Sequence, residues 1–64
     1  MIKFEKNGEE NGKTAWLVKQ SFAGRWLVAA SIVFDGQDWV LRSGAGRIDR
    51  FETLREAKEE ALKI

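Results

Sequence analysis

Residues 25–41, RWLVAASIVFDGQDWVL, decide the fold of this 64-residue chain. Before Asp35, apolar side chains recur with a period of two, which is typical of a strand with one buried face. The pair Asp35-Gly36 is a strong signal for a β-hairpin. A two-residue turn there pairs Ile32 with Trp39, so apolar side chains meet across the hairpin. The segment therefore predicts two antiparallel strands.

Residues 14–20, TAWLVKQ, predict another strand on the other side of this hairpin. A two-residue turn at positions 23–24 would pair Trp16 with a serine and mix the two faces of the sheet. A three-residue loop, residues 22–24, pairs Trp16 with Ala30 and keeps the faces separate. We therefore predict the three-residue loop. The core face is then expected to carry Trp16, Val18, Trp26, Val28, Ala30, Ile32, Phe34, Trp39 and Leu41.

The segments at both ends of this region are less regular. Residues 2–5, IKFE, alternate as well, and the loop 6–13, with two Asn-Gly pairs, would let them fold back as an added strand. SGAGR at 43–47 bends the chain, and RIDRF at 47–51 is either a short extended edge or a connector. No repeat or linker interrupts the chain, so we expect a single domain spanning residues 1–64.

The last segment, RFETLREAKEEALKI, predicts one amphipathic helix. Thr53 and Glu56 have the spacing of a capping box, which satisfies backbone donors of the first turn. Glu59 and Lys63 have the favourable spacing for an ion pair on the outer face. The apolar stripe consists of Leu54, Ala57, Ala61 and Ile64, with Leu62 at its margin.

The two alanines of this stripe would let the helix lie close to large aromatic rings on the sheet. The sequence therefore predicts an α+β domain: an antiparallel sheet of three to five strands, with a β-β-β-α core, and one C-terminal helix packed on one face.

Composition excludes several kinds of chemistry. The chain has no Cys and no His, which removes disulfides, thiol chemistry and the commonest metal ligands and general bases. Asp35 and Asp38 are expected to form a turn and not a cation site, and no helix follows residues 44–47 as a phosphate loop requires. We therefore expect a non-enzymatic protein without cofactor or metal. The apolar stretch LVAASIVF is too short to span a bilayer, and we expect a soluble cytoplasmic protein without membrane contact.

Charge and apolar residues on the face opposite the helix suggest two partners. Six of the basic residues, against three Asp, lie between Lys13 and Arg50. The predicted reverse face carries Leu17, Lys19, Leu27, Val33, Val40 and Arg42. Its aliphatic residues are more than a solvated face needs, although isolated surface aliphatics are also ordinary in strands.

A curved antiparallel sheet followed by the pattern F-x-T-x-x-E-A resembles two kinds of DNA-binding domain. The pattern is formed by Phe51, Thr53, Glu56 and Ala57. The resemblance is to the small domain of plant ethylene-response transcription factors and to the arm-binding domains of some phage integrases. It implies that the sheet lies in the major groove, with Arg and Trp side chains on DNA. It also suggests a small regulatory or accessory protein of a phage.

Two functions follow as hypotheses. The first is a double-stranded DNA binder whose contacts are made by Lys19, Arg25, Arg42, Arg47 and Arg50. The alternative is a protein-interaction module, either a homodimer or a small effector docked on a host protein, whose contacts are made by Leu17, Leu27, Val33 and Val40.

Overall fold

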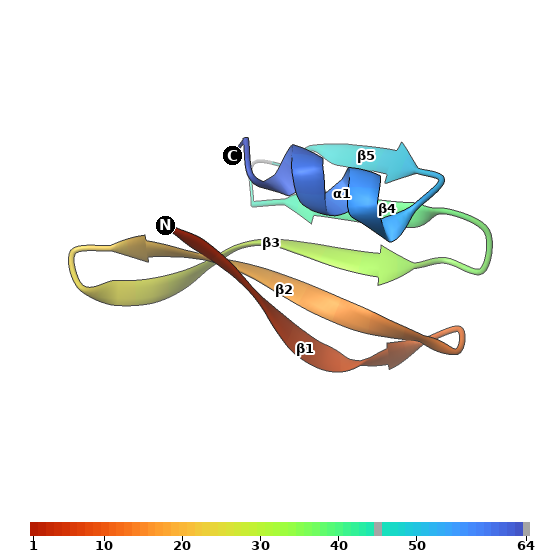
Figure 1. Ribbon diagram of the computed structural model, residues 1–64, viewed down its shortest axis with the longest axis horizontal. Coiled ribbons are helices and arrows are strands. Elements are labelled where there is room, and N and C mark those ends of the chain that lie inside the picture. The colour runs from red at the N-terminus through yellow and green to blue at the C-terminus, as the bar shows by residue number, and fades with distance from the viewer. Residues whose placement is uncertain (45, 64) are drawn as a thin grey trace.

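The structure is a computed structural model that describes residues 1–44 and 46–63. Its five strands form one antiparallel sheet in chain order, and a single helix follows them (Figure 1). The elements are β1 (Ile2–Glu10), β2 (Lys13–Phe22), β3 (Arg25–Phe34), β4 (Trp39–Ser43), β5 (Ile48–Phe51) and α1 (Leu54–Ala61). The predicted α+β class, with an antiparallel sheet and one C-terminal helix, is confirmed. RIDRF is an edge strand and not a connector, because β5 pairs with β4.

The β3–β4 hairpin has a longer turn than the sequence predicts. Phe34 pairs with Trp39, so four residues form the loop, and Asp35 Oδ1 accepts the backbone N–H groups of Gln37 and Asp38 at 2.8 and 2.7 Å. Ile32 consequently pairs with Leu41, and the predicted pairing of Ile32 with Trp39 is wrong. The register differs by an even number of residues, so each side chain keeps its predicted face.

The β2–β3 hairpin turns at Ala23 and Gly24, and the predicted three-residue loop is wrong. Phe22 pairs with Arg25, and the two turn residues have φ values of 54° and 76°. Positive φ at both central positions is the backbone of the two-residue hairpin turn whose twist matches that of the strands.

A β-bulge further along the same ladder restores the predicted faces. Lys19 pairs with Val28 but Val18 pairs with Ala30, so Ala29 is an extra residue in β3. From residue 30 to the end of β3, the side chains lie on the faces that the sequence predicts. In residues 25–28 of β3, the two faces are exchanged, because one extra residue reverses the alternation of side chains.

This exchange corrects the predicted core. Trp26 and Val28 are 41% and 59% exposed and lie on the face opposite the helix. Leu27, which was expected on that opposite face, is 49% exposed and shares a face with Gln20, on the helix side of the sheet.

β1 is longer than the expected IKFE strand. Residues 2–5 join the sheet, and pairing with β2 continues to Glu10. Of the two Asn-Gly pairs, Asn11-Gly12 forms the turn, with φ values of 54° and 80°, while Asn7-Gly8 lies at a bulge. Most of the expected loop is therefore strand.

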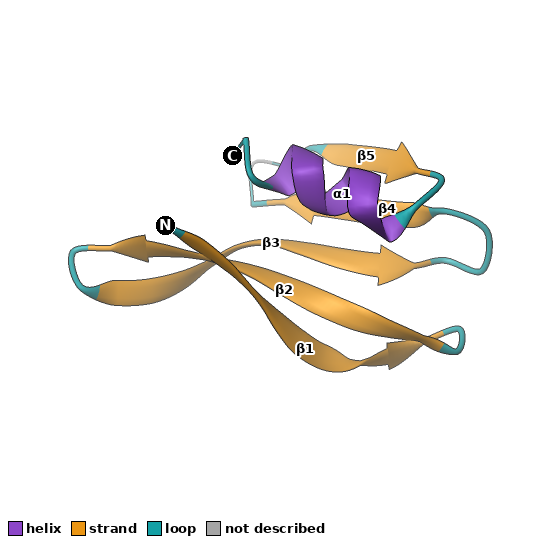
Figure 2. Ribbon diagram, in the orientation of Figure 1, coloured by secondary structure: helices purple, strands orange, loops and turns teal. Residues whose placement is uncertain are grey.

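The core lies between α1 and the central strands. Figure 2 shows the helix over β4 and β5, and it also contacts β3. The buried cluster consists of Val18, Ala30, Ile32, Leu41, Ala57 and Ala61, with Trp16, Trp39, Phe4, Ile2, Phe51 and Leu54 packed against it. Trp16 and Trp39 therefore lie on the predicted side of the sheet.

The capping box of α1 is present, although the helix is shorter than expected. The Glu56 N–H donates to Thr53 Oγ1 at 3.2 Å, and the Thr53 hydroxyl donates to Glu56 Oε1 at 3.1 Å. Lys63 pairs with Glu60 at 3.3 Å, and the predicted pair with Glu59 is not the one observed. Leu62 is exposed, and Ile64 lies outside the described residues.

The far end of the β2–β3 hairpin extends beyond the helix, β4 and β5 as a projecting arm (Figure 1). We call the part formed by residues 19–28 the arm. Because α1 does not reach it, side chains on both of its faces are open to solvent, among them Phe22, Trp26, Leu27 and Val28. Within residues 1–44 and 46–63, no helix has the length and apolar character needed to cross a membrane.

Candidate nucleic-acid interface

The sheet has one face covered by α1 and one open face. The register of the ladders assigns side chains to these faces, because residues directly opposite one another in neighbouring strands share a face. Lys3 lies opposite Lys19, and Arg42 lies opposite Ser31, all on the open face. Trp26 pairs with Ser21, which lies two residues after Lys19 in β2, so the Trp26 side chain is on the open face as well. We call Lys3, Lys19, Trp26 and Arg42 the basic patch. Arg25, at the tip of the arm, pairs with Phe22 and lies on the helix side together with Leu27, so it is not part of this patch although it was predicted to contact DNA.

Lys3, Lys19 and Trp26 are held together by direct contacts. Lys3 Nζ lies 4.3 Å from the centroid of the Trp26 ring, a cation–π distance. Glu5 lies between the two lysines, with Oε1 3.1 Å from Lys19 Nζ and Oε2 3.9 Å from Lys3 Nζ. Exposed ion pairs of this kind contribute about 0–1 kcal/mol. The lysines can therefore exchange this carboxylate for another anion at little cost.

Arg25 and Arg42 are both exposed and form no ion pair with any residue in the described ranges. Arg42 borders a shallow depression of about 250 Å³ where β4 ends beside the bulge of β3. Val28 and Ser43 also line it. A guanidinium in this position has its donors available for a phosphate or a base edge.

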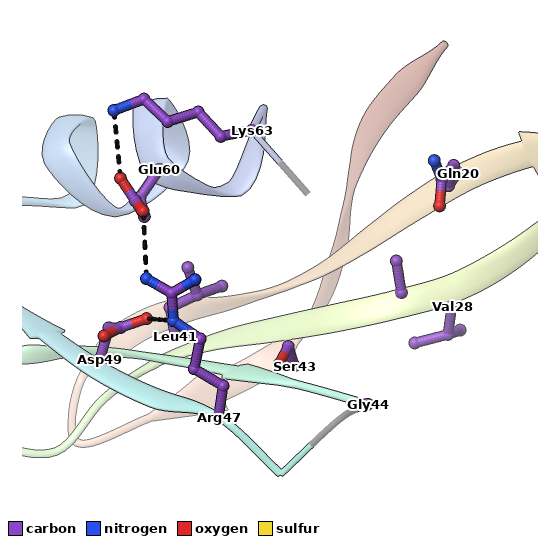
Figure 3. A pocket seen from close by; sticks show the side chains of 10 residues that line it. Gln20, Val28, Leu41, Ser43, Gly44, Arg47, Asp49, Glu60 and Lys63 are labelled. Carbon is purple, nitrogen blue, oxygen red and sulfur yellow. Dashed lines mark hydrogen bonds and ion pairs between the residues drawn. The ribbon is translucent and has the colours of Figure 1, made fainter.

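Arg47 lies on the helix side of the sheet, away from the basic patch. Its Nε is 2.7 Å from Asp49 Oδ2, and its Nη2 is 3.3 Å from Glu60 Oε1, so the side chain joins β5 to α1 (Figure 3). Arg47 was predicted to contact DNA, but its guanidinium is engaged by these two carboxylates on the helix side.

Arg50, also predicted to contact DNA, is engaged by the β3–β4 loop. It pairs with Asp35 and lies 3.7 Å from Asp38 Oδ2. The backbone N–H groups of Asp38 and Gln37, and then the Arg50 guanidinium, lower the pKa of Asp35 from 3.8 to about 2. The carboxylate therefore stays charged and keeps Arg50 at the loop.

A pocket of about 490 Å³ lies on the helix side, between the end of α1 and the arm (Figure 3). Its rim carries two basic side chains, Arg47 and Lys63, and both pair with Glu60. Apolar Val28 and Leu41 also line it. The rim charges neutralise one another, so the pocket does not favour an anion or a cation. In the described part of the chain, no group of three or more acidic or metal-binding side chains could hold a metal ion.

The predicted aliphatic contact surface is not formed as one patch. Val40 is only 3% exposed, because it lies between Val33 and Arg50 of the neighbouring strands. Leu17 and Val33 are half-buried, and Leu27 is exposed on the other face. These four residues therefore do not share an accessible surface.

Lys3 and Trp26 are the members of the basic patch that the sequence did not indicate. The signal for Trp26 was the Ala23-Gly24 pair, read as a two-residue turn, which puts Trp26 on the same face as Ser21. The signal for Lys3 was its alternation with Ile2 and Phe4, which pack on the core. The function of this surface is inferred from its own geometry and charge, because no family model matches the chain and no curated protein or solved structure matches it.

Proposed function

We propose that this protein binds double-stranded DNA through the open face of its sheet. The observation that supports this most is the basic patch, in which Lys3, Lys19 and Arg42 share the open face with the exposed ring of Trp26. Glu5 is the acidic residue that pairs within it. An excess of cations on a surface without a covering helix favours a polyanion.

The residue types suit separate parts of a duplex. Lys3 and Lys19 act as point charges on phosphates, while Arg42 can donate two hydrogen bonds to a phosphate or to guanine. A β-ribbon fits within the major groove. The resemblance to ethylene-response domains implies sheet Arg and Trp at the DNA, and Trp26 offers such a side chain on the open face.

The test is a titration of labelled duplex DNA, followed by fluorescence anisotropy at salt concentrations from about 50 to 200 mM. Three phosphate contacts predict that log K falls with log salt with a slope of about −3. Arg42→Ala should weaken binding and reduce the magnitude of this slope by about 1. Absence of binding at about 50 mM salt would overturn the proposal.

Arg55→Ala is the matched control, because it removes the same charge from the outer surface of α1, where the Arg55 side chain is 88% exposed. It should leave the affinity and the slope almost unchanged. Equal losses from Arg42→Ala and Arg55→Ala would show that net charge, and not the open face, governs binding.

A further inference from the structure

The arm presents an unpaired strand edge. Pairing between β3 and β4 ends at Ala30 and Ser43, and the last contact is the hydrogen bond from the Gly44 N–H to the Ala29 carbonyl at 3.2 Å. Residues 25–28 of β3 therefore have a strand neighbour on the β2 side only, as far as the described chain extends. Figure 1 shows that none of α1, β4 and β5 lies beside this end of the hairpin.

This edge lacks the features that normally keep strand edges apart. Natural edges are protected by charges, by proline or by a bulge within the exposed segment. Here the segment Trp26-Leu27-Val28 is apolar, and all three side chains are at least 41% exposed. The bulge comes after them, at Ala29. Such an edge is a template for another strand.

We propose that a second copy of this chain pairs with the edge, antiparallel and around a two-fold axis at Leu27. In an antiparallel ladder the backbone groups of successive residues point alternately to either side. Phe22 and Arg25 flank the two-residue turn as a hydrogen-bonded pair, so the groups of Trp26 and Val28 point outward. Trp26 of one copy then exchanges two backbone hydrogen bonds with Val28 of the other, and the symmetry repeats this pair.

The pairing of side chains favours this register, and it favours a second copy of the chain as the strand that pairs with the edge. With Leu27 opposite Leu27 on the helix side, Trp26 meets Val28 on the open face, and the paired segment ends before Ala29, whose carbonyl accepts the Gly44 N–H. Trp26, Leu27 and Val28 therefore each have an apolar partner, and no like charges are opposed. Placing Trp26 opposite itself would put Arg25 against Leu27, and an odd shift would pair side chains of opposite faces.

The dimer has a consequence for the open faces. A two-fold axis perpendicular to the local sheet keeps the open faces of both copies on the same side, so the two basic patches would face one surface together. The dimer does not depend on the proposed function, because the edge pairing involves protein alone. A short edge buries little area, so we expect a reversible dimer.

The first test uses a cysteine at the axis. The chain contains no cysteine, so Leu27→Cys introduces a single thiol. In the proposed ladder Leu27 and its copy form a non-hydrogen-bonded pair, whose Cα atoms lie about 4.5 Å apart, and a disulfide can span this distance. Under mild oxidation, Leu27→Cys should become a covalent dimer at least about tenfold faster than Leu62→Cys, at a position that is slightly more exposed. Equal rates would overturn the proposal.

The second test is sedimentation of the DNA-free protein between about 10 μM and 1 mM, a range suited to a small interface. The wild type should shift from monomer to dimer. Leu27→Asp places two carboxylates against each other and should abolish the shift, while Leu62→Asp should keep it. A wild type that stays monomeric throughout overturns the proposal, even if another protein's extended segment binds the edge. Dimerisation without DNA binding would contradict only the proposed function.

Discussion

Asp35 shows how a single side chain organises a turn. Its carboxylate accepts two backbone N–H groups, from Gln37 and Asp38, and also pairs with Arg50 of β5. One residue thus closes the β3–β4 loop and connects it to the edge strand. The donors favour the charged form, which is why the pKa lies at about 2 in place of 3.8.

This pKa predicts how stability depends on pH. A carboxyl whose pKa is lowered by folding stabilises the native state above its ordinary pKa of 3.8, and the contribution is lost as the pH falls towards about 2. Asp35→Asn should therefore show a smaller loss of thermal stability between pH 5 and 2 than the wild type, measured by circular dichroism. The control is Glu52→Gln, which removes an exposed carboxylate from the residue just before the N-cap of α1. If Asp35→Asn and the wild type lose stability in parallel, the Asp35 carboxylate does not have this role.

At the scale of elements, the two tight hairpins differ in how well their residues suit the turn. Asn11-Gly12 and Ala23-Gly24 both have positive φ at both positions. Asparagine and glycine adopt this conformation readily, whereas for alanine the left-handed region costs about 1–2 kcal/mol. The arm therefore turns at a strained residue, while the β1–β2 hairpin does not.

Ala23→Asn should stabilise the protein by about 1 kcal/mol, because it supplies the residue pair that this turn favours. Urea unfolding measured by tryptophan fluorescence gives the difference in the free energy of unfolding. Ala23→Val is the opposite control, since a β-branched residue at positive φ should destabilise the turn. A destabilised Ala23→Asn would show that the turn does not have this backbone in solution.

At the scale of the whole molecule, one short helix and one sheet supply the only core in the described residues. The helix is eight residues long and buries two alanines, Ala57 and Ala61, against the centre of the sheet. This covers the part of the sheet formed by β3, β4 and β5 and leaves the arm outside. A domain of this size is expected to have a free energy of unfolding of about 3–10 kcal/mol.

Ile32 should be critical to such a small core. It is fully buried, and Ile32→Ala is expected to cost about 2–5 kcal/mol, a large part of the total. Urea unfolding should show a strongly lowered midpoint or an unfolded protein. Ile48→Ala makes the same truncation at a residue that is 59% exposed, and its effect should stay within about 0.5 kcal/mol. Equal effects of the two substitutions would contradict the proposed position of the core.

The candidate site could be predicted only in part, and the reason differs from residue to residue. Lys19 and Arg42 lie on the open face as expected, whereas Arg25 lies on the helix side of the arm. Arg47 and Arg50 form ion pairs on the helix side and at the β3–β4 loop, with partners that include Glu60 and Asp35. Those partners come from distant parts of the chain, and no local pattern indicates them. Trp26 was placed on the wrong face because one bulge reverses the alternation before it.

The sequence by itself determined the order of the three central strands and the helix, the cap at Thr53 and the separation of faces from Ala30 onward. These follow from local periodicity and local hydrogen bonds, which neighbouring residues contain. Only the tertiary structure decided the turn at Ala23-Gly24, the bulge at Ala29 and the exposure of the arm. Alternation assigns side chains to two faces, but it does not say how far along a strand the helix reaches. Because α1 ends before the arm, apolar burial does not select the register of the strands there. The register is set by the twist of the two-residue turn.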